Sequence, residues 1–301
     1  MSALFHLYLC GRKAAEWLIT MKNLGYYNGH YDEIENMVIP MNDRAHYFGD
    51  GVYDATYSRN HIIWNLQEHL DRLYNSARLL EIEPPCSKEE MAEILKEMVK
   101  KVDNGNQFVY WQVSRGTADR NHAFPKGVKS NLWIMLRPRN VSDNHPVKVV
   151  TTEDTRFLHC NIKTLNLIPS VMAAEKAEKA GVDECIFHRN GRVTECAHSN
   201  VHIIRDGKLV TAPTDNLILP GIARANLIRM AKKLGYEVEE IPYTLDDLMA
   251  AEEVIITRCG SFCQPVCEVD GKPVGGKQPE MLKRLQDALM AEYLEYTDIK
   301  E

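Results

Sequence analysis

The sequence predicts an α+β fold with two domains. Its 301 residues exceed the size of a typical single domain. Strand-like and helical segments mix without a strict strand–helix–strand repeat, which argues against a doubly wound sheet. A polar stretch without apolar periodicity also interrupts the chain at residues 138–146. We therefore expect an N-terminal extension of unassigned role over 1–23, a small domain over 24–140, a linker over 141–147 and a larger domain over 148–301.

Local signals define the elements of the first half. Asn28-Gly29 is a favoured hairpin turn between two apolar stretches. Leucine and alanine recur at helical spacing over residues 66–80, and Ser87 with Glu90 forms a capping box. The predicted elements are a hairpin over 25–39, a strand region over 43–57, helices over 66–80 and 87–101, and strands over 108–116 and 131–138 that bracket a polar loop over 117–127.

The second half shows the same mixture of strands and helices. Asn190-Gly191 and Asp206-Gly207 mark turns within a long strand-rich stretch, which we read as two or three strands. The predicted elements are a strand over 147–153, a strand around residue 163, a helix over 171–180, the strands of 184–210, a helix over 222–234, a buried strand over 252–257, a hairpin over 267–274 and a closing helix over 280–296.

Composition excludes several classes of protein. The net charge of −6 gives no general attraction to nucleic acid or to anionic membranes. No stretch approaches the roughly 20 apolar residues of a membrane span, and no secretory signal precedes the eight cysteines, so we expect a reducing cytoplasm. Cys259, Cys263 and Cys267 are spaced by four and lack the CxxC pattern, so no metal site is expected.

One lysine, Lys163, lies in the apolar segment HCNIKTLNLI over residues 159–168. Desolvating an ammonium group is costly, so such a lysine either extends its charge to solvent or serves as a nucleophile. The residues alone leave both readings open, and the extended lysine is the commoner case. The apolar neighbours expected in the core are Ile162, Leu165, Leu167 and Ile168.

The remaining motifs are weak. Residues 271–277 spell GxxxxGK, but Gln278 replaces the Ser or Thr of a phosphate loop, and the segment follows a hairpin. GxGxxG, HExxH and GxSxG are absent from the sequence. Pro220-Gly221 directly precede a predicted helix, whose first N–H groups could bind an anion such as phosphate.

Six segments, read together, match one family of enzymes. They are FGDGVYDATY (48–57), EHLDRLYNSA (68–77), QVSRGTADRNHAFP (112–125), CNIKTLNLI (160–168), ECIFHRNGRVTECAHSN (184–200) and LILPGIAR (217–224). These segments closely resemble the D-amino acid aminotransferases, which belong to the class IV, fold-type IV transaminases that depend on pyridoxal phosphate. The similarity keeps the same order from about Gly25 to Leu282. It implies a smaller N-terminal α/β domain and a larger, β-barrel-like C-terminal α+β domain.

The resemblance implies that Lys163 forms the Schiff base with pyridoxal phosphate. An amine must be deprotonated to attack a carbonyl group, and an apolar strand beside a cationic site would lower the pKa of this lysine. Once displaced by the substrate amine, the lysine would move a proton between the substrate Cα and C4′ of the cofactor. Lys163 is therefore expected to be both the covalent anchor and the general acid–base.

The resemblance also assigns the rest of the cofactor site. Glu195 matches the partner of the pyridine nitrogen, and Arg156 and His69 match groups that keep this glutamate ionised and oriented. Arg72 matches the arginine that binds the phosphate, where a planar guanidinium suits a phosphate face. The further positions expected at the cofactor are Leu219 against the ring, the phosphate cup of Gly221, Ile222 and Ala223, and Cys259 in a run that carries hydroxyl residues in the family.

Substrate recognition is expected to depend on the polar loop. Arg120 and His122 match the RxH pair that, together with Tyr53, binds the substrate α-carboxylate in the D-specific enzymes. In the family this loop comes from the partner subunit, which implies a homodimer with shared active sites. The expected function is transamination between D-amino acids, such as D-alanine or D-glutamate, and 2-oxo acids. The alternatives are an L-branched-chain aminotransferase and a 4-amino-4-deoxychorismate lyase.

The chain departs from the family at the phosphate site. Arg258 and Cys259 stand in the hydroxyl run, Ala223 replaces a threonine of the phosphate cup, and His198 stands where a serine is usual. Each missing hydroxyl costs about 1–2 kcal/mol of binding energy if its bond is not replaced. Arg258 could compensate at the phosphate or reach into the substrate pocket, and the sequence leaves both open.

Overall fold

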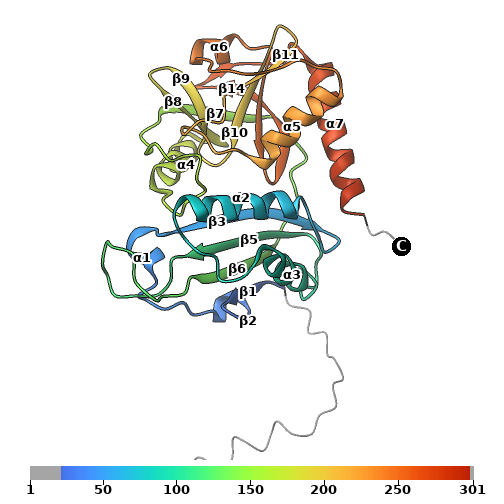
Figure 1. Cartoon of the computed structure of the whole chain (residues 1–301). Helices are drawn as coiled ribbons and strands as arrows, with labels where there is room; N and C mark the ends of the chain where they lie inside the picture. Colours follow the sequence, from blue (N-terminus) through green and yellow to red (C-terminus); the bar gives the residue numbers. More distant parts are fainter. Residues whose placement is uncertain (1–21, 299–301) are drawn as a thin grey trace, which may run out of the picture.

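The computed structural model describes residues 22–298, which form two lobes, each built around one β-sheet (Figure 1). The predicted extension over residues 1–23 lies almost wholly outside the described residues. The first sheet uses residues 24–138 and the second uses residues 147–273. The predicted linker over 141–147 therefore falls between the two sheets, except that Val147 already begins a strand.

The first sheet is antiparallel throughout. Its strand order is β2 (His30–Asp32), β1 (Leu24–Tyr27), β6 (Asn131–Pro138), β5 (Gln107–Ser114), β3 (Gly51–Arg59) and β4 (Ile62–Ile63). The predicted turn joins β1 to β2, because Asn28 and Gly29 both adopt positive φ, which these residue types tolerate. The hairpin is shorter than predicted, since a 3-10 helix, η1 (Ile34–Asn36), follows it.

Helices α2 (Leu66–Leu79) and α3 (Lys88–Val99) cover this sheet. The predicted apolar spacing is confirmed, because Leu70 and Leu73 of α2 are fully buried and share a core with Trp111 of β5. The predicted capping box at the start of α3 is also present. Figure 1 shows α2 between the first sheet and the second lobe, so its polar face can reach the space between the lobes.

The second sheet mixes parallel and antiparallel pairs. Its strand order is β12 (Val238–Glu240), β11 (Lys208–Thr211), β10 (Asn200–Arg205), β13 (Glu253–Arg258), β14 (Ser261–Val269), β7 (Val147–Glu153), β8 (Glu184–Arg189) and β9 (Arg192–Cys196), with β15 (Lys272–Pro273) paired to β14. The pairs β11–β12, β7–β14 and β7–β8 are parallel. Because the terminal strand β9 also contacts β10, the sheet curls, which confirms the predicted barrel-like C-terminal lobe.

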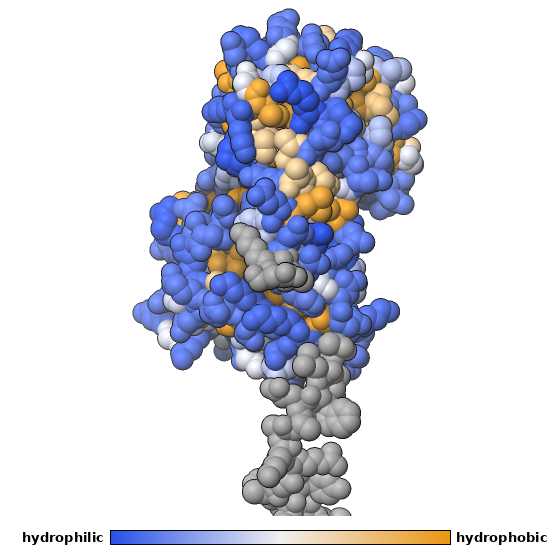
Figure 2. Space-filling view, turned by 90° about the vertical axis from the view of Figure 1, so that its right-hand side faces the viewer, coloured by the Kyte–Doolittle hydropathy of each residue, from blue (hydrophilic) through white to orange (hydrophobic). Residues whose placement is uncertain are grey.

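Four helices accompany the second sheet: α4 (Ile168–Ala180), α5 (Ile222–Lys233), α6 (Leu245–Ala250) and α7 (Pro279–Tyr296). Helices α5 and α7 pack on β14 and share a core that includes Leu227, Phe262, Leu285 and Leu289. Helix α4 packs on β7 and β8. Seen from the side in Figure 2, the surface is largely hydrophilic and the molecule narrows where the two lobes meet. Across residues 22–298, no helix combines the length and the apolar character that crossing a membrane requires.

Three local predictions were wrong. The strand region over 43–57 contains a short helix, α1 (Arg44–Phe48), because Asp43 caps its start and Gly49 ends it in the left-handed conformation. The stretch over 184–210 holds four strands, not two or three. Residue 163 lies in an irregular segment, and Leu167 and Ile168 are exposed, not in the core.

Candidate active site

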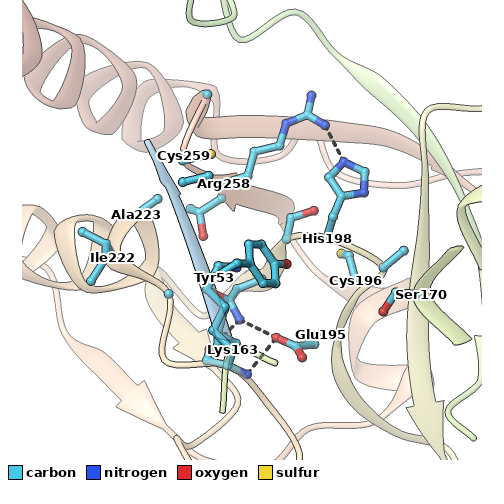
Figure 3. Close-up of a pocket in the computed structure, with 18 of the residues that line it drawn as sticks. Tyr53, Lys163, Ser170, Glu195, Cys196, His198, Ile222, Ala223, Arg258 and Cys259 are labelled. Carbon is cyan, nitrogen blue, oxygen red and sulfur yellow. Dashed lines mark hydrogen bonds between the residues drawn. The ribbon is translucent and has the colours of Figure 1, made fainter. Parts of the chain in front are cut away.

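A cavity of about 570 Å³ lies between the two lobes and is lined by residues from both. This volume is typical of a small-molecule site. The first lobe contributes residues of β3 and α2, and the second contributes the segment around residue 163, the connection from β9 to β10, the start of α5 and the end of β13 (Figure 3). The predicted site residues that line it are Tyr53, His69, Arg72, Arg156, Lys163, Glu195, Leu219, Gly221, Ile222, Ala223 and Cys259.

The backbone of Lys163 is tied to the first lobe. Its carbonyl oxygen accepts a hydrogen bond from the Tyr53 N–H at 3.0 Å, and its N–H donates to Ser76 Oγ at 3.2 Å. Its side chain crosses the Tyr53 ring, with Nζ 4.2 Å from the ring centroid. Within residues 22–298 this ammonium group forms no ion pair with a carboxylate. The cavity thus contains an amine in a fixed position without a counter-ion.

A buried carboxylate, that of Glu195, lies in the same cavity. Its Oε1 accepts a hydrogen bond from the Arg156 guanidinium, and its Oε2 accepts from Asn200 Nδ2 at 3.0 Å and from the Leu219 N–H at 2.9 Å. Burial raises the pKa of the Glu195 carboxyl, and the Arg156 charge opposes this shift. These partners fix the orientation of the Glu195 carboxylate in the cavity, and Figure 3 shows hydrogen bonds to it as dashed lines.

A second buried carboxylate, that of Asp54 on β3, holds Arg72. The Arg72 guanidinium donates to both oxygens of Asp54, at 2.8 and 2.7 Å, and His69 Nδ1 lies 2.7 Å from the same carboxylate. Although burial acts to raise it, the charges of Arg72 and His69 hold the pKa of the Asp54 carboxyl well below its usual range. The direct partner of His69 is therefore Asp54, and its predicted effect on Glu195 stays a prediction.

The start of α5 faces the Arg72 guanidinium, whose Nη1 donates to the Pro220 carbonyl oxygen at 3.3 Å. Gly221 is the N-cap residue, and no side chain caps the N–H groups that follow. A Cβ at Gly221 would collide with Asn200 Oδ1, so only glycine allows this close approach. The helix start and the guanidinium together present positive charge and N–H donors to one end of the cavity.

These groups fit pyridoxal phosphate. The cofactor requires a lysine amine for its aldehyde, an anion beside its ring nitrogen and a cationic cradle for its phosphate. Lys163 and Glu195 are present for the first two, and Arg72 with the first turn of α5 for the third. Ala223 and Cys259 line the cavity without hydroxyl groups, so the phosphate contacts would fall to backbone N–H groups and Arg72.

The structure does not bring the predicted carboxylate trap together within one chain. Tyr53 lines the cavity, but Arg120 and His122 lie in the exposed loop between β5 and β6 and do not line it. The Arg120 Cζ atom is 5.2 Å from the centroid of the Phe48 ring, and the His122 ring is 5.0 Å from it, centroid to centroid.

Sequence reasoning missed three residues that orient the site. Asp54 holds Arg72, Asp154 receives two hydrogen bonds from the Arg156 guanidinium, and Asn200 donates to Glu195. The signal for Asp54 was a charged side chain within the apolar strand that begins at Gly51. Asp154 and Asn200 carried no such signal, because their partners Arg156 and Glu195 lie only two and five positions away and no sequence motif shows that these side chains pair.

The chain matches the family model Amino-transferase class IV over residues 51–269. The D-alanine aminotransferase of Listeria monocytogenes serotype 1/2a is 39% identical over 274 residues, which cover 88% of this chain and 94% of that protein. The D-alanine aminotransferase of Bacillus licheniformis is 36% identical over 276 residues, 90% of this chain and 97% of that one.

Among solved structures, a branched-chain amino acid aminotransferase from T.th., complexed with N-(5'-phosphopyridoxyl)-L-glutamate, superposes with a TM-score of 0.82. The two sequences are 25% identical, and the superposition covers 92% of this chain and 98% of the branched-chain enzyme. Its bound molecule carries the phosphopyridoxyl group for which the cavity is suited. From the match along the sequence, the shared fold and the fit of the cavity, the chain belongs to the class IV aminotransferases and is an enzyme dependent on pyridoxal phosphate.

Proposed function

We propose that this enzyme transfers the amino group between D-amino acids, such as D-alanine or D-glutamate, and 2-oxo acids. The observation that carries the proposal is the cavity itself, in which an amine without a counter-ion and an oriented buried carboxylate lie beside an anion-binding helix start. The similarity of this chain to proteins named D-alanine aminotransferase supports the assignment of D-amino acids as substrates, because it extends over nearly the whole chain.

Each residue of the cavity has a defined part in this proposal. Pyridoxal phosphate, when bound, supplies an electron sink for negative charge at the substrate Cα. Lys163 would hold the cofactor and then remove and return the proton at the substrate Cα. Glu195, oriented by Arg156, would keep a proton on the ring nitrogen, and Arg72 with the start of α5 would hold the phosphate.

We propose further that two copies of the chain share their active sites. In support, apolar side chains are exposed beside the cavity. Phe157 and Leu167 line the cavity and are exposed, and Ile168 and Met172 on α4 are each 69% accessible. Such an exposed apolar patch is typical of an interface. Arg120 and His122 lie away from their own Lys163, so the partner's copies would complete the substrate site.

A reducing cytoplasm is the proposed location. The seven cysteines within residues 22–298 are all free thiols, as is usual in that compartment and unusual in secreted proteins.

The test is a stereospecificity assay with purified, cofactor-loaded protein. D-alanine, L-leucine and 4-amino-4-deoxychorismate are offered separately with 2-oxoglutarate, and the glutamate formed is resolved by enantiomer. We expect D-alanine to yield pyruvate and D-glutamate, and the Lys163→Ala variant to yield neither.

Two outcomes would contradict the proposal. Turnover of L-leucine alone would indicate a branched-chain aminotransferase, which the similarity to the solved structure of such an enzyme keeps as the second candidate. Release of pyruvate from 4-amino-4-deoxychorismate without any 2-oxo acid would indicate a lyase.

A further inference from the structure

Arg258, at the end of β13, brings a positive charge into the cavity that no carboxylate within residues 22–298 neutralises. Its Nη1 lies 2.9 Å from His198 Nε2, and its Nη2 donates to Gln264 Oε1 at 3.1 Å. Both partners are uncharged acceptors in this arrangement. The other deep arginines of the site differ, because Arg72 pairs with Asp54 and Arg156 pairs with Asp154 and Glu195.

His198 orients this guanidinium without removing its charge. A guanidinium only donates hydrogen bonds, so His198 Nε2 must accept, and the ring proton then lies on Nδ1. That nitrogen lies 3.0 Å from Oε2 of the buried Glu184, which accepts the hydrogen bond from Nδ1–H.

Arg258 points away from the end of the cavity suited to phosphate. Figure 3 shows its side chain directed toward His198, on the side of the cavity opposite Ile222 and Ala223. The side chain of the next residue, Cys259, lies on the Ala223 side in the same view. The phosphate end already has Arg72 and the start of α5. The guanidinium is therefore available to a different anionic group.

A second cation lies on the same side. Arg139, in the segment between the two sheets, also lines the cavity, and its charge acts on His198. No ion pair of Arg139 with a carboxylate occurs within residues 22–298. Arg258 and Arg139, which form no ion pair with a carboxylate of the described residues, would select a substrate group with negative charge.

We propose that Arg258, positioned by His198 and Gln264, binds the side-chain carboxylate of acidic amino acids and of the matching dicarboxylic 2-oxo acids. This inference rests on the proposed transaminase function, in which Tyr53 and the partner's Arg120 and His122 take the α-carboxylate. A planar guanidinium can donate two parallel hydrogen bonds to a carboxylate, and the neutral ring of His198 leaves the charge of Arg258 available to that ligand. Arg258 and His198 together thus give the enzyme a preference for substrates with two carboxylates over substrates with one, such as D-alanine and pyruvate.

The test compares Arg258→Gln with wild-type holoenzyme. We expect kcat/KM for D-glutamate and 2-oxoglutarate to fall about 10- to 100-fold, which is the usual effect of losing a charge-assisted hydrogen bond, while D-alanine and pyruvate change less than about threefold. Binding of glutarate, followed by the cofactor absorbance, should weaken by the same factor, and binding of butyrate should not. Arg229→Gln, which removes an arginine paired with Glu292 on α7, is the matched control and should leave all values unchanged.

Several results would overturn the proposal. Equal losses with D-alanine and D-glutamate would place Arg258 on the α-carboxylate, and a weaker affinity for pyridoxal phosphate alone would place it on the phosphate. No change in glutarate binding would remove its role altogether. If Arg258→Gln does not fold, Arg258→Lys, which keeps the charge and loses the planar fork, should still weaken glutarate relative to butyrate. A wild-type enzyme that uses no D-amino acid would refute the proposed function, whereas glutarate binding would still test Arg258.

Discussion

At the scale of single residues, Asp54 determines where Arg72 can act. The carboxylate is fully buried and receives hydrogen bonds from Arg72 and His69, so its removal leaves a buried cation without its partner. Breaking a buried ion pair typically costs about 3–5 kcal/mol. We therefore expect Asp54→Asn to lower the free energy of unfolding by about 4 kcal/mol. We also expect a roughly tenfold weaker affinity for pyridoxal phosphate, because the guanidinium loses its orientation.

Urea unfolding and a cofactor titration check this prediction. The matched control is Asp71→Asn, which removes an exposed pair with Lys88 and should change the unfolding free energy by less than about 1 kcal/mol. If Asp54→Asn behaved like the control in both measurements, the account of Arg72 would be wrong.

The sequence identifies Lys163, Glu195 and Arg156 as candidate site residues, but it does not identify Asp54 and Asn200, which orient Arg72 and Glu195. Lys163 and Glu195 lie in short segments that resemble the family, and the structure brings both to one cavity. Asp54 and Asn200 act through partners that are 18 and 5 positions away, and no local pattern shows that such pairs will meet. Burial of a polar side chain depends on the tertiary fold.

At the scale of elements, the centre of the second sheet contains a neutral histidine. His202 on β10 lies between Thr211 of β11 and Thr257 of β13, with ring-nitrogen distances of 2.8 and 2.9 Å to their hydroxyls. Burial lowers its pKa from 6.5 to about 3. Below pH 6.5 the unfolded chain binds a proton that the folded sheet does not, so stability falls as the pH decreases toward 3.

The expected loss is about 1.4 kcal/mol per pH unit, or roughly 2 kcal/mol between pH 6.5 and 5. Urea unfolding at both pH values should show this decrease in the wild type, and a decrease smaller by about that amount in His202→Gln. His30→Gln, at an exposed position of β2, should keep the wild-type pH dependence. An unchanged pH dependence in His202→Gln would contradict the assignment.

Elements with a clear period or cap could be predicted, and short or irregular ones could not. The apolar spacing of α2 and the capping box of α3 suffice to define those helices. The five residues of α1 are too few to show a helical period, although Asp43 and Gly49 carried the capping signal. The segment of Lys163 is apolar enough to suggest a strand, but only a single bridge at Thr164 pairs it with β3.

At the scale of the whole molecule, the substrate site is proposed to need two chains. Complementation tests this: Lys163→Ala and Arg120→Gln should each be inactive alone. Mixed after reversible dissociation, they should regain up to about a quarter of wild-type activity, since half of the dimers would be hybrids with one intact site. Activity of Arg120→Gln alone, or mixtures that stay inactive, would contradict a shared site.

The arrangement of the two lobes lies beyond a single sequence. The length of the chain and the polar stretch near residue 140 predicted two units, and the described structure has one sheet on each side of that stretch. The cavity forms only where the lobes meet, and its lining comes from segments spread between residues 53 and 260. Which surfaces face each other depends on packing between the lobes, which periodicity along the chain does not encode.

The central claim is that Lys163 carries the cofactor. The direct measurement is borohydride reduction of the loaded enzyme, followed by peptide mass mapping. We predict that the pyridoxyl group is found on the peptide containing Lys163, and that Lys163→Ala retains no covalent label. A label on another lysine, or an equal label in Lys163→Ala, would contradict the account.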